Sequence, residues 1–225
     1  MTLQIGFLLF PDVQQLDLTG PHEVFASLPD TAVHLVGKDL APLKASSGLT
    51  LVPNTTFDTC PALDVICVPG GAGVGDLMED AETLAFLRRQ ADHARFVTSV
   101  CTGSLVLGAA GLLRGYRATT HWASHHLLEP LGAIAVRERV VCDRNRVTGG
   151  GITAGIDFAL TLAKELIGEQ EAQAVQLLLE YAPAPPFDAG SPESAPQAVV
   201  ESVRRRFAGS IARREEIVAR VAAGF

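Results

Sequence analysis

A cysteine stands where a predicted strand turns into a predicted helix. Cys101 follows the predicted strand residues Phe96-Val97-Thr98-Ser99-Val100 and precedes Thr102 and Gly103. Small residues on both sides permit the sharp turn of a nucleophile elbow, and the free amides and dipole of a helix N-terminus stabilise a thiolate. Because a free thiol has a pKa of ~8.5, lowering it by about two would make the thiolate the major form at neutral pH. The pattern predicts a nucleophilic cysteine; the alternative is a buried thiol that only packs.

A glycine-rich loop closes the preceding predicted strand. It spans residues 68–73 and contains Gly70, Gly71 and Ala72. Backbone amides at the carboxyl end of a parallel strand can converge on a ligand oxygen or carbanion. The loop is neither GxGxxG nor a Walker loop, so nucleotide binding is unsupported. Beside a cysteine on the next strand it predicts an anion-stabilising loop, whereas alone it would be an ordinary tight turn.

A carboxylate lies in an apolar setting between Leu16 and Leu18. Burying Asp17 without a partner is costly. Asp17 is either a structural cap for a helix that begins near Pro21, which the local pattern favours, or a proton donor and acceptor beside the thiol.

Two histidines, His121 and His125, have the i, i+4 spacing of a metal pair. No HExxH motif or nearby carboxylate accompanies them, so we predict no metal site. As a catalytic base, His121 competes with a structural role, and Asp17 is the better candidate.

The other cysteines, Cys60, Cys67 and Cys142, lie in or beside apolar runs and are predicted to be packing thiols. Four cysteines without a CxxC pair exclude a disulfide framework and indicate a reducing compartment.

Short apolar runs alternate with helical patterns along the chain. Near-continuous apolarity over a few residues is typical of strands covered on both faces. Strands are predicted over residues 3–10, 32–37, 64–69 and 95–100, and helices over residues 21–28, 81–91, 102–113, 153–167 and 169–181. The alternation predicts an α/β fold with a doubly wound, mostly parallel sheet and helices on both faces.

Composition narrows the class of protein. The 225 residues are 48% apolar and carry a net charge of −7, which excludes wholesale disorder and disfavours binding to nucleic acid. There is no cationic leader and no apolar run of membrane-spanning length, so we expect a soluble cytoplasmic protein. After the Pro-rich residues 182–196, interleaved Arg and Glu predict a helical tail that docks on the domain or clasps a dimer. We therefore expect a domain of residues 1–195 and a tail of residues 196–225.

Several motifs together resemble the ThiJ/PfpI superfamily, which shares the flavodoxin-like fold of class I glutamine amidotransferases. The resemblance extends from about residue 3 to 195. Its motifs are Phe10-Pro11-Asp12, Leu16-Asp17, Gly20-Pro21-His22-Glu23-Val24-Phe25, Val68-Pro69-Gly70-Gly71, Cys101-Thr102-Gly103, Ala110-Gly111-Leu112-Leu113, Ala118-Thr119-Thr120-His121-Trp122, Gln176, Glu180-Tyr181 and Pro185-Pro186-Phe187-Asp188.

The resemblance implies a cofactor-free, homodimeric enzyme, similar to members that hydrate isonitriles to N-substituted formamides through a cysteine thioimidate. It implies Cys101 as nucleophile, Asp17 as its carboxylate partner, and Thr102 as a contact to the substrate or the attacking water. Gly70, Gly71, Ala72 and His121 are the expected substrate-binding residues, with neither metal, nucleic acid nor membrane as a partner.

The sequence departs from the family pattern at two positions, and two other functions remain as alternatives. Protease-like relatives have His where this chain has Thr102, which argues against a Cys-His dyad, and many relatives have Glu where this chain has Asp17. Similar signatures occur in AraC-type regulators, but about 30 residues after position 195 are too few for their helix-turn-helix pair. A glyoxalase-like or redox-sensing thiol protein is the other alternative.

Overall fold

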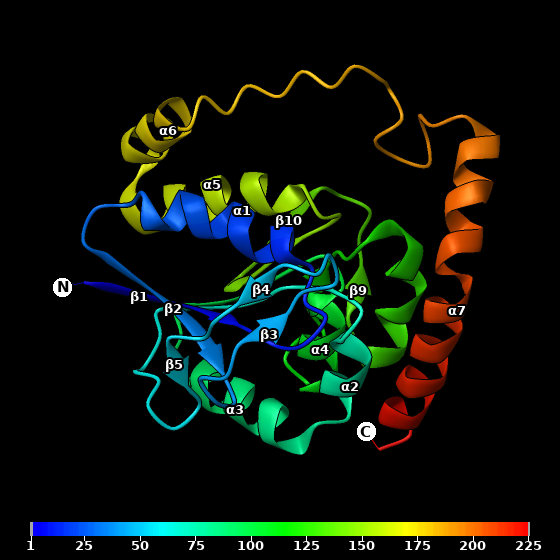
Figure 1. Ribbon diagram of the computed structural model, residues 1–225, viewed down its shortest axis with the longest axis horizontal. Coiled ribbons are helices and arrows are strands. Elements are labelled where there is room, and N and C mark those ends of the chain that lie inside the picture. The colour runs from blue at the N-terminus through cyan, green and yellow to red at the C-terminus, as the bar shows by residue number, and fades with distance from the viewer. Residues whose placement is uncertain (1, 225) are drawn as a thin grey trace.

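The computed structural model describes residues 2–224, which form one seven-stranded sheet between two layers of helices (Figure 1). The strand order is β10-β11-β7-β6-β1-β2-β5, and only the edge strand β10 pairs antiparallel. The strands are β1 Leu3–Leu8, β2 Thr31–Gly37, β5 Thr55–Thr56, β6 Val65–Val68, β7 Phe96–Val100, β10 Val140–Asp143 and β11 Arg146–Gly149. The predicted flavodoxin-like α/β fold is confirmed.

Helices cover both faces of this sheet. On one face α1 packs against α5, and α5 against α6; on the other, α4 contacts β6, β7, α2 and α3 (Figure 1). Their bounds are α1 Gln15–Ala26, α2 Val74–Met78, α3 Ala81–Ala91, α4 Gly103–Ala109, α5 Ala154–Ile167 and α6 Glu169–Leu178. This coverage explains why the central strands are almost uniformly apolar.

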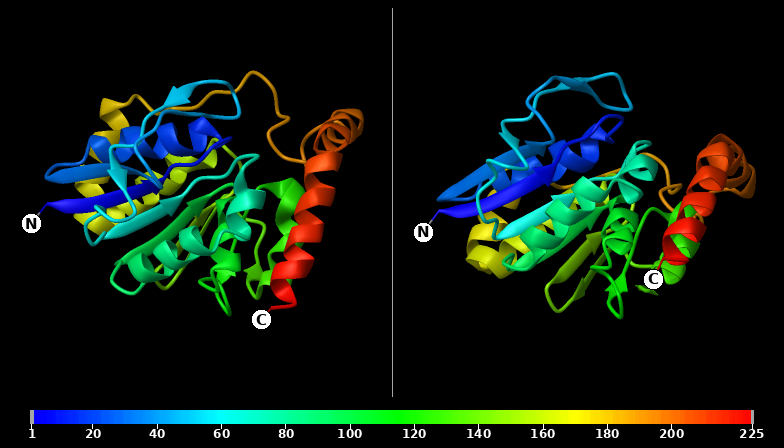
Figure 2. Two further views of the ribbon diagram at one scale, coloured as in Figure 1. Left: turned by 60° about the horizontal axis from the view of Figure 1, so that its bottom comes forward. Right: turned by 90° about the horizontal axis from the view of Figure 1, so that it is seen from below.

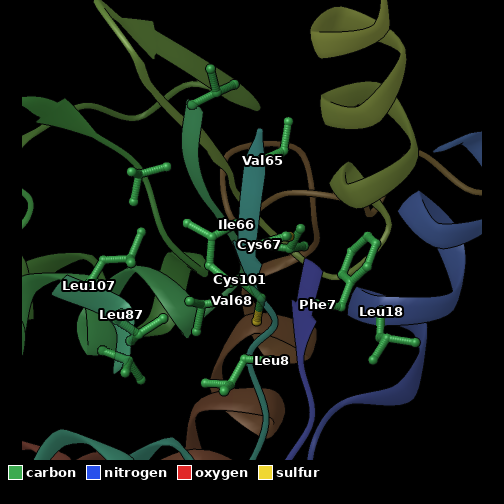
Figure 3. Close-up of a cluster of buried hydrophobic side chains, with 14 of the residues drawn as sticks. Phe7, Leu8, Leu18, Val65, Ile66, Cys67, Val68, Leu87, Cys101 and Leu107 are labelled. Carbon is green, nitrogen blue, oxygen red and sulfur yellow. The ribbon is translucent and has the colours of Figure 1, made fainter. Parts of the chain in front are cut away.

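The core between the layers is continuous and rich in aromatic rings. Phe25 lies 6.0 Å from Phe7 and 6.1 Å from Phe158, ring centroid to ring centroid, and all three rings are buried. Figure 3 shows the labelled Cys101 near Val68, toward the carboxyl end of β6. The close-packed core therefore supplies a rigid frame for the sulfur at its edge.

A long helix stands at the carboxyl ends of the parallel strands. Helix α7, Gln197–Ala222, contacts α2, α4 and the 3₁₀ helices η1 Trp122–Leu127 and η2 Glu129–Leu131. Residues 179–196 connect it to α6 (Figures 1 and 2). Ligands of open α/β sheets bind at this edge of the sheet, so α7 lies where a site is expected.

Several element bounds differ from the sequence predictions. Helix α1 begins at Gln15 and includes Pro21, so the predicted start at residue 21 is wrong. Helix α4 covers only Gly103–Ala109, and α7 ends at Ala222, with residue 225 outside the described part of the chain. Unpredicted elements are β5, β10, β11 and the short pairs β3 Leu43–Lys44 with β4 Thr50–Leu51, and β8 Arg117–Ala118 with β9 Ile134–Ala135. None of the helices within residues 2–224 has both the length and the apolar character needed to cross a bilayer.

Candidate active site

Cys101 occupies the turn between β7 and α4 in a left-handed backbone conformation. Its φ of 55° is unfavourable for a residue with a side chain, so neighbouring groups must hold it. The Cys101 amide donates to the carbonyl oxygen of Gly149 at 3.0 Å, and its own carbonyl accepts from the hydroxyls of Thr120 at 2.9 Å and Ser104 at 3.2 Å. These bonds hold the strained turn and leave the side chain at the carboxyl end of β7.

Gly103 makes this sharp turn possible. A Cβ at position 103 would collide with the backbone carbonyl of Val68 on the adjacent strand. Helix α4 therefore starts in direct contact with the end of β6, and the requirement for a small residue two positions after the cysteine has a steric cause.

Asp17 lies beside Cys101, although the two residues come from different elements. The side chain is fully buried in the first turn of α1, and its Oδ2 accepts a hydrogen bond from the Gly70 amide at 2.9 Å. Oδ1 has no geometrically defined hydrogen bond within the described residues, but the carboxyl group is close enough to the Cys101 thiol for each to change the other's pKa. Asp17 is not a helix cap, so that interpretation is wrong.

The Asp17 carboxyl group is poised to exchange a proton near neutrality. Burial raises its pKa from 3.8 to about 7, against the opposing effects of the Gly70 amide and the Cys101 thiol. Removing a carboxylate from water disfavours its charged form, and one amide offsets only part of that cost. Such a pKa suits a group that both takes up and releases a proton.

The Cys101 thiol does not have the lowered pKa that its position predicts. Burial and the negative charge of Asp17 raise its pKa well above the ordinary value, while the amide and hydroxyl of Thr102 lower it. The side chain is only 6% exposed, so loss of hydration outweighs the stabilisation offered by the short helix α4. The prediction of a resting thiolate is therefore wrong, and the thiol needs a base when it reacts.

The glycine loop holds these two side chains. The Gly70 amide is bonded to Asp17, and the Gly71 amide donates to the hydroxyl oxygen of Thr102 at 3.2 Å. A Cβ on Gly70 would lie 2.7 Å from Thr102 Oγ1 and 2.8 Å from Asp17 Oδ2. The prediction that the Gly70 and Gly71 amides stabilise an anion is wrong, because both donate to side chains of the protein and orient them.

A cavity of about 210 Å³ opens beside the sulfur. It brings together five of the predicted site residues, Cys101, Thr102, Gly71, Ala72 and His121, whereas Gly70 and Asp17 do not line it. The remaining lining residues are Gln14, Ser46, Ala123, Ile152, Phe207, Ser210 and Arg214. The site thus combines strand ends, loops and the distant C-terminal helix.

His121 forms part of the cavity wall in its neutral form. Its Nδ1 accepts a hydrogen bond from the Ala123 amide at 3.3 Å, and its ring packs edge-on against Phe207 at 5.4 Å. Burial, together with the positive charge of Arg214, lowers the pKa of His121 to about 4. The ring can therefore line an apolar pocket without carrying charge at neutral pH.

His125 does not line this cavity, and its hydrogen bond is to another part of the chain. It is on the 3₁₀ helix η1, and its Nε2 donates to the carbonyl oxygen of Val136 at 2.8 Å. Among residues 2–224, no group of three or more His, Cys, Asp or Glu side chains could hold a metal ion.

The C-terminal helix supplies three lining residues that the sequence patterns did not single out. Phe207, Ser210 and Arg214 face the cavity from α7, and the Nη2 of Arg214 donates to the carbonyl oxygen of Gly71 at 3.1 Å. The only sequence signal was the amphipathic tail, and this indicates docking without specifying the surface.

The other three cysteines differ in how deeply they are buried. Burial raises the pKa of Cys67 to about 12 and that of the half-buried Cys60 to about 11. Cys142 is exposed, contrary to its predicted packing role, because it lies on the edge strand β10.

Comparison with known proteins identifies the family. Residues 4–165 match the model of the DJ-1/PfpI family. The chain belongs to this family. The resemblance to ThiJ/PfpI proteins is thereby confirmed, and the matched region contains Asp17, the glycine loop and Cys101 but not helix α7.

Similarity also extends beyond the family region. The chain is 71% identical over 223 residues to the isonitrile hydratase of Pseudomonas putida, covering 99% of this chain and 98% of the relative. A ThiJ/PfpI family protein from Pseudomonas syringae superposes with a TM-score of 0.95 at 44% identity, covering 97% of this chain and 91% of that structure. The HTH-type transcriptional regulator GbdR of Pseudomonas aeruginosa is 35% identical over 185 residues, which cover 79% of this chain but 50% of the regulator. The first two similarities include α7.

Proposed function

We propose that this protein hydrates isonitriles to N-substituted formamides with Cys101 as the nucleophile and Asp17 as the proton carrier. The observation that carries the proposal is the buried Asp17–Cys101 pair beside a cavity, in a chain 71% identical to an isonitrile hydratase over nearly its whole length. Thr102, Gly71, Ala72 and His121 would contact the substrate from the cavity wall.

The first step adds the thiol across the terminal carbon of the isonitrile. This carbon is electrophilic toward soft nucleophiles, so sulfur forms a bond to it while Asp17 accepts the thiol proton. Asp17 then delivers that proton to the same carbon. The product is a thioimidate, R–N=CH–S–Cys101, and Asp17 is again a carboxylate.

The second step is hydrolysis of the thioimidate. Water adds its oxygen to the carbon, and a proton reaches the nitrogen through Asp17, giving R–NH–CH(OH)–S–Cys101. Collapse forms the carbonyl and breaks the carbon–sulfur bond, releasing R–NH–CHO, and the hydroxyl proton returns to sulfur. In this scheme the Thr102 hydroxyl orients the water, and the contacts of the Thr102 amide and hydroxyl with the Cys101 thiol support this role.

The environment of Asp17 suits both steps. A carboxyl group with a pKa of about 7 can both accept the proton from the thiol and release it to carbon. Near neutral pH, neither transfer costs much free energy. The surrounding protein buries both Cys101 and Asp17, and a water-poor setting strengthens the electrostatic interaction between the two groups.

The assay compares turnover of cyclohexyl isonitrile by the wild type, Cys101→Ala and a buffer blank, with the formamide quantified by mass spectrometry. We expect formamide only with the wild type, and a covalent adduct of one isonitrile on the peptide containing Cys101 after acid quenching. Lactate formed from methylglyoxal without any formamide would favour a glyoxalase-like protein instead. A shifted promoter fragment without turnover would favour a regulator.

The assembly and location belong to the same proposal. We infer a cytoplasmic homodimer built from a domain of residues 1–195 and a tail of residues 196–225. The exposed apolar side chains Leu177, Leu178 and Phe187, at the end of α6 and in the linker after it, support burial against a second copy. Light scattering coupled to size-exclusion chromatography measures the mass directly, and a monomer at micromolar concentration would contradict the dimer.

A further inference from the structure

Helix α7 is fastened to the domain by ion pairs that lie outside the cavity. Arg213 forms an ion pair with Asp76 and Arg220 forms one with Glu79 at 2.8 Å, while His126 Nε2 is hydrogen-bonded to Glu215 Oε1 at 2.9 Å. All six side chains are well exposed, so each pair contributes little to stability by itself. The buried side chains Ile217 and Val218 dock α7 on the hydrophobic core, and with the helix in this position Arg214 lines the cavity beside Cys101.

Arg214 differs from these neighbours because no carboxylate neutralises it. None of the salt bridges between residues 2–224 includes Arg214, and its hydrogen bond goes to the neutral carbonyl of Gly71. The side chain is half-buried and lines the cavity together with Cys101 and Thr102. Its positive charge is therefore directed into the space where the sulfur reacts.

The contact at Gly71 links Arg214 to the rest of the site. The Gly71 carbonyl accepts from Arg214, while the Gly71 amide donates to Thr102, whose hydroxyl and amide lie at the sulfur. One peptide segment is thus held from both sides. Displacing Arg214 would loosen the loop that positions Thr102.

The titratable groups around Cys101 come from three elements. Asp17 on α1 opposes ionisation of the thiol, His121 before η1 is neutral near pH 7, and Arg214 on α7 interacts electrostatically with both Cys101 and His121. Among these three, only Arg214 can offset the charge that develops on sulfur.

We propose that Arg214 is a positioning residue: it holds the Gly71 loop against Thr102 and keeps a positive charge beside the Cys101 sulfur as the thiol ionises. Helix α7 then contributes directly to the reactivity of the site. This inference rests on Cys101 being the nucleophile of the proposed function, but it concerns the reactivity of the sulfur toward any electrophile.

Alkylation of Cys101 by iodoacetamide measures this reactivity without an isonitrile. The reagent is neutral, so a change in local charge acts through the sulfur and not through attraction of the reagent. The rate is followed from pH 5 to 10 by mass spectrometry of the peptide containing Cys101, which separates it from the exposed Cys142. Arg213→Gln, on the adjacent exposed position, is the matched control.

For Arg214→Gln we expect alkylation of Cys101 to be about 10-fold slower at pH 7.5 and the whole rate–pH profile to move to higher pH, because an opposite charge nearby favours the ionised form. Arg214→Lys should recover part of the rate, since it keeps the charge but not the planar donor geometry. Arg213→Gln should keep the wild-type profile. Arg214→Met, which preserves the apolar stem, replaces the Gln variant if that variant loses helicity by circular dichroism.

A folded neutral variant at position 214 with the wild-type pH profile would overturn the inference. Formamide synthesis is measured in parallel with the same proteins. If the profile shifts but the wild type produces no formamide, the proposed function fails and the role of Arg214 stands. If formamide is produced and the profile does not shift, the proposed function stands and this inference fails.

Discussion

The carboxyl group of Asp17 and the thiol of Cys101 have opposite effects on each other's acidity. The negative charge of Asp17 raises the pKa of Cys101, whereas the nearby Cys101 thiol lowers the pKa of Asp17. Burial raises both values and is the largest cause for each. The two groups therefore act as one proton-sharing unit, and the reactivity of the sulfur depends on the carboxylate that faces it.

Replacing the sulfur should abolish turnover. Cys101→Ala is expected to produce formamide at the rate of the buffer blank, because no other described thiol lines the cavity. Cys142→Ala, on the exposed edge strand, is the matched control and should keep the wild-type rate. Full activity in Cys101→Ala would remove the nucleophile from the proposal.

The pH dependence of turnover should report Asp17. Since the thiol needs a carboxylate to accept its proton, kcat/KM for an isonitrile should rise as pH increases through about 7, the pKa of Asp17. Asp17→Asn should lower the rate by about 10²–10⁴ and remove this inflection. A wild-type profile that is flat between pH 5 and 9 would argue against proton transfer through Asp17.

The same carboxyl group should make folding stability fall as pH rises. Its pKa is about 7 in the folded protein against 3.8 for an exposed carboxyl, so the folded state binds the proton more tightly than the unfolded chain. The cost is absent below pH 3.8, grows between pH 3.8 and 7, and is complete above pH 7, where it reaches about 4 kcal/mol at most.

Urea denaturation at pH 5 and pH 8 measures this effect. The difference in free energy of unfolding between Asp17→Asn and the wild type should shift in favour of the variant from pH 5 to pH 8. If the difference in unfolding free energy between variant and wild type is the same at pH 5 and pH 8, ionisation of buried Asp17 does not destabilise the folded protein.

The hydroxyl of Thr102 should matter for structure as well as for rate. Thr102→Val leaves the Gly71 amide without its acceptor in a mostly buried setting, which should cost about 1–3 kcal/mol of folding free energy. Thr102→Ser keeps the oxygen and serves as the control. Urea denaturation and formamide synthesis of both variants test this, and equal stability of the Val and Ser variants would contradict the hydrogen bond's role.

Phe207 should determine which isonitriles bind well. Its ring packs edge-on against His121 and forms an apolar part of the cavity wall. In Phe207→Ala, KM for cyclohexyl isonitrile should rise about 10-fold while kcat changes less, since one apolar contact contributes roughly 1–3 kcal/mol to substrate discrimination. Leu40→Ala, at a side chain that is 54% exposed and outside the cavity wall, should leave KM unchanged.

Much of the architecture follows from local patterns in the sequence. Helix α3 has the predicted bounds 81–91, and β1, β2, β6 and β7 lie within one or two residues of their predicted positions, because fully apolar runs between Gly, Pro and Asp have few alternative structures. Strands β10 and β11 escaped prediction because each has only four residues and their hairpin end is charged, with Asp143, Arg144 and Arg146. The start of α1 was missed because Pro21, which usually marks a first turn, lies inside the helix.

The sequence by itself determined which residue types were available: a cysteine at a strand–helix turn, a glycine loop and one carboxylate in an apolar setting. Tertiary structure alone decided that Asp17 faces Cys101, that the Gly70 and Gly71 amides bind side chains, and that Arg214 reaches the same cavity from α7. The physical reason is that burial and contacts between distant segments set the pKa of each group. A local pattern predicts a turn and its dipole, but it does not specify which charges the fold places beside it.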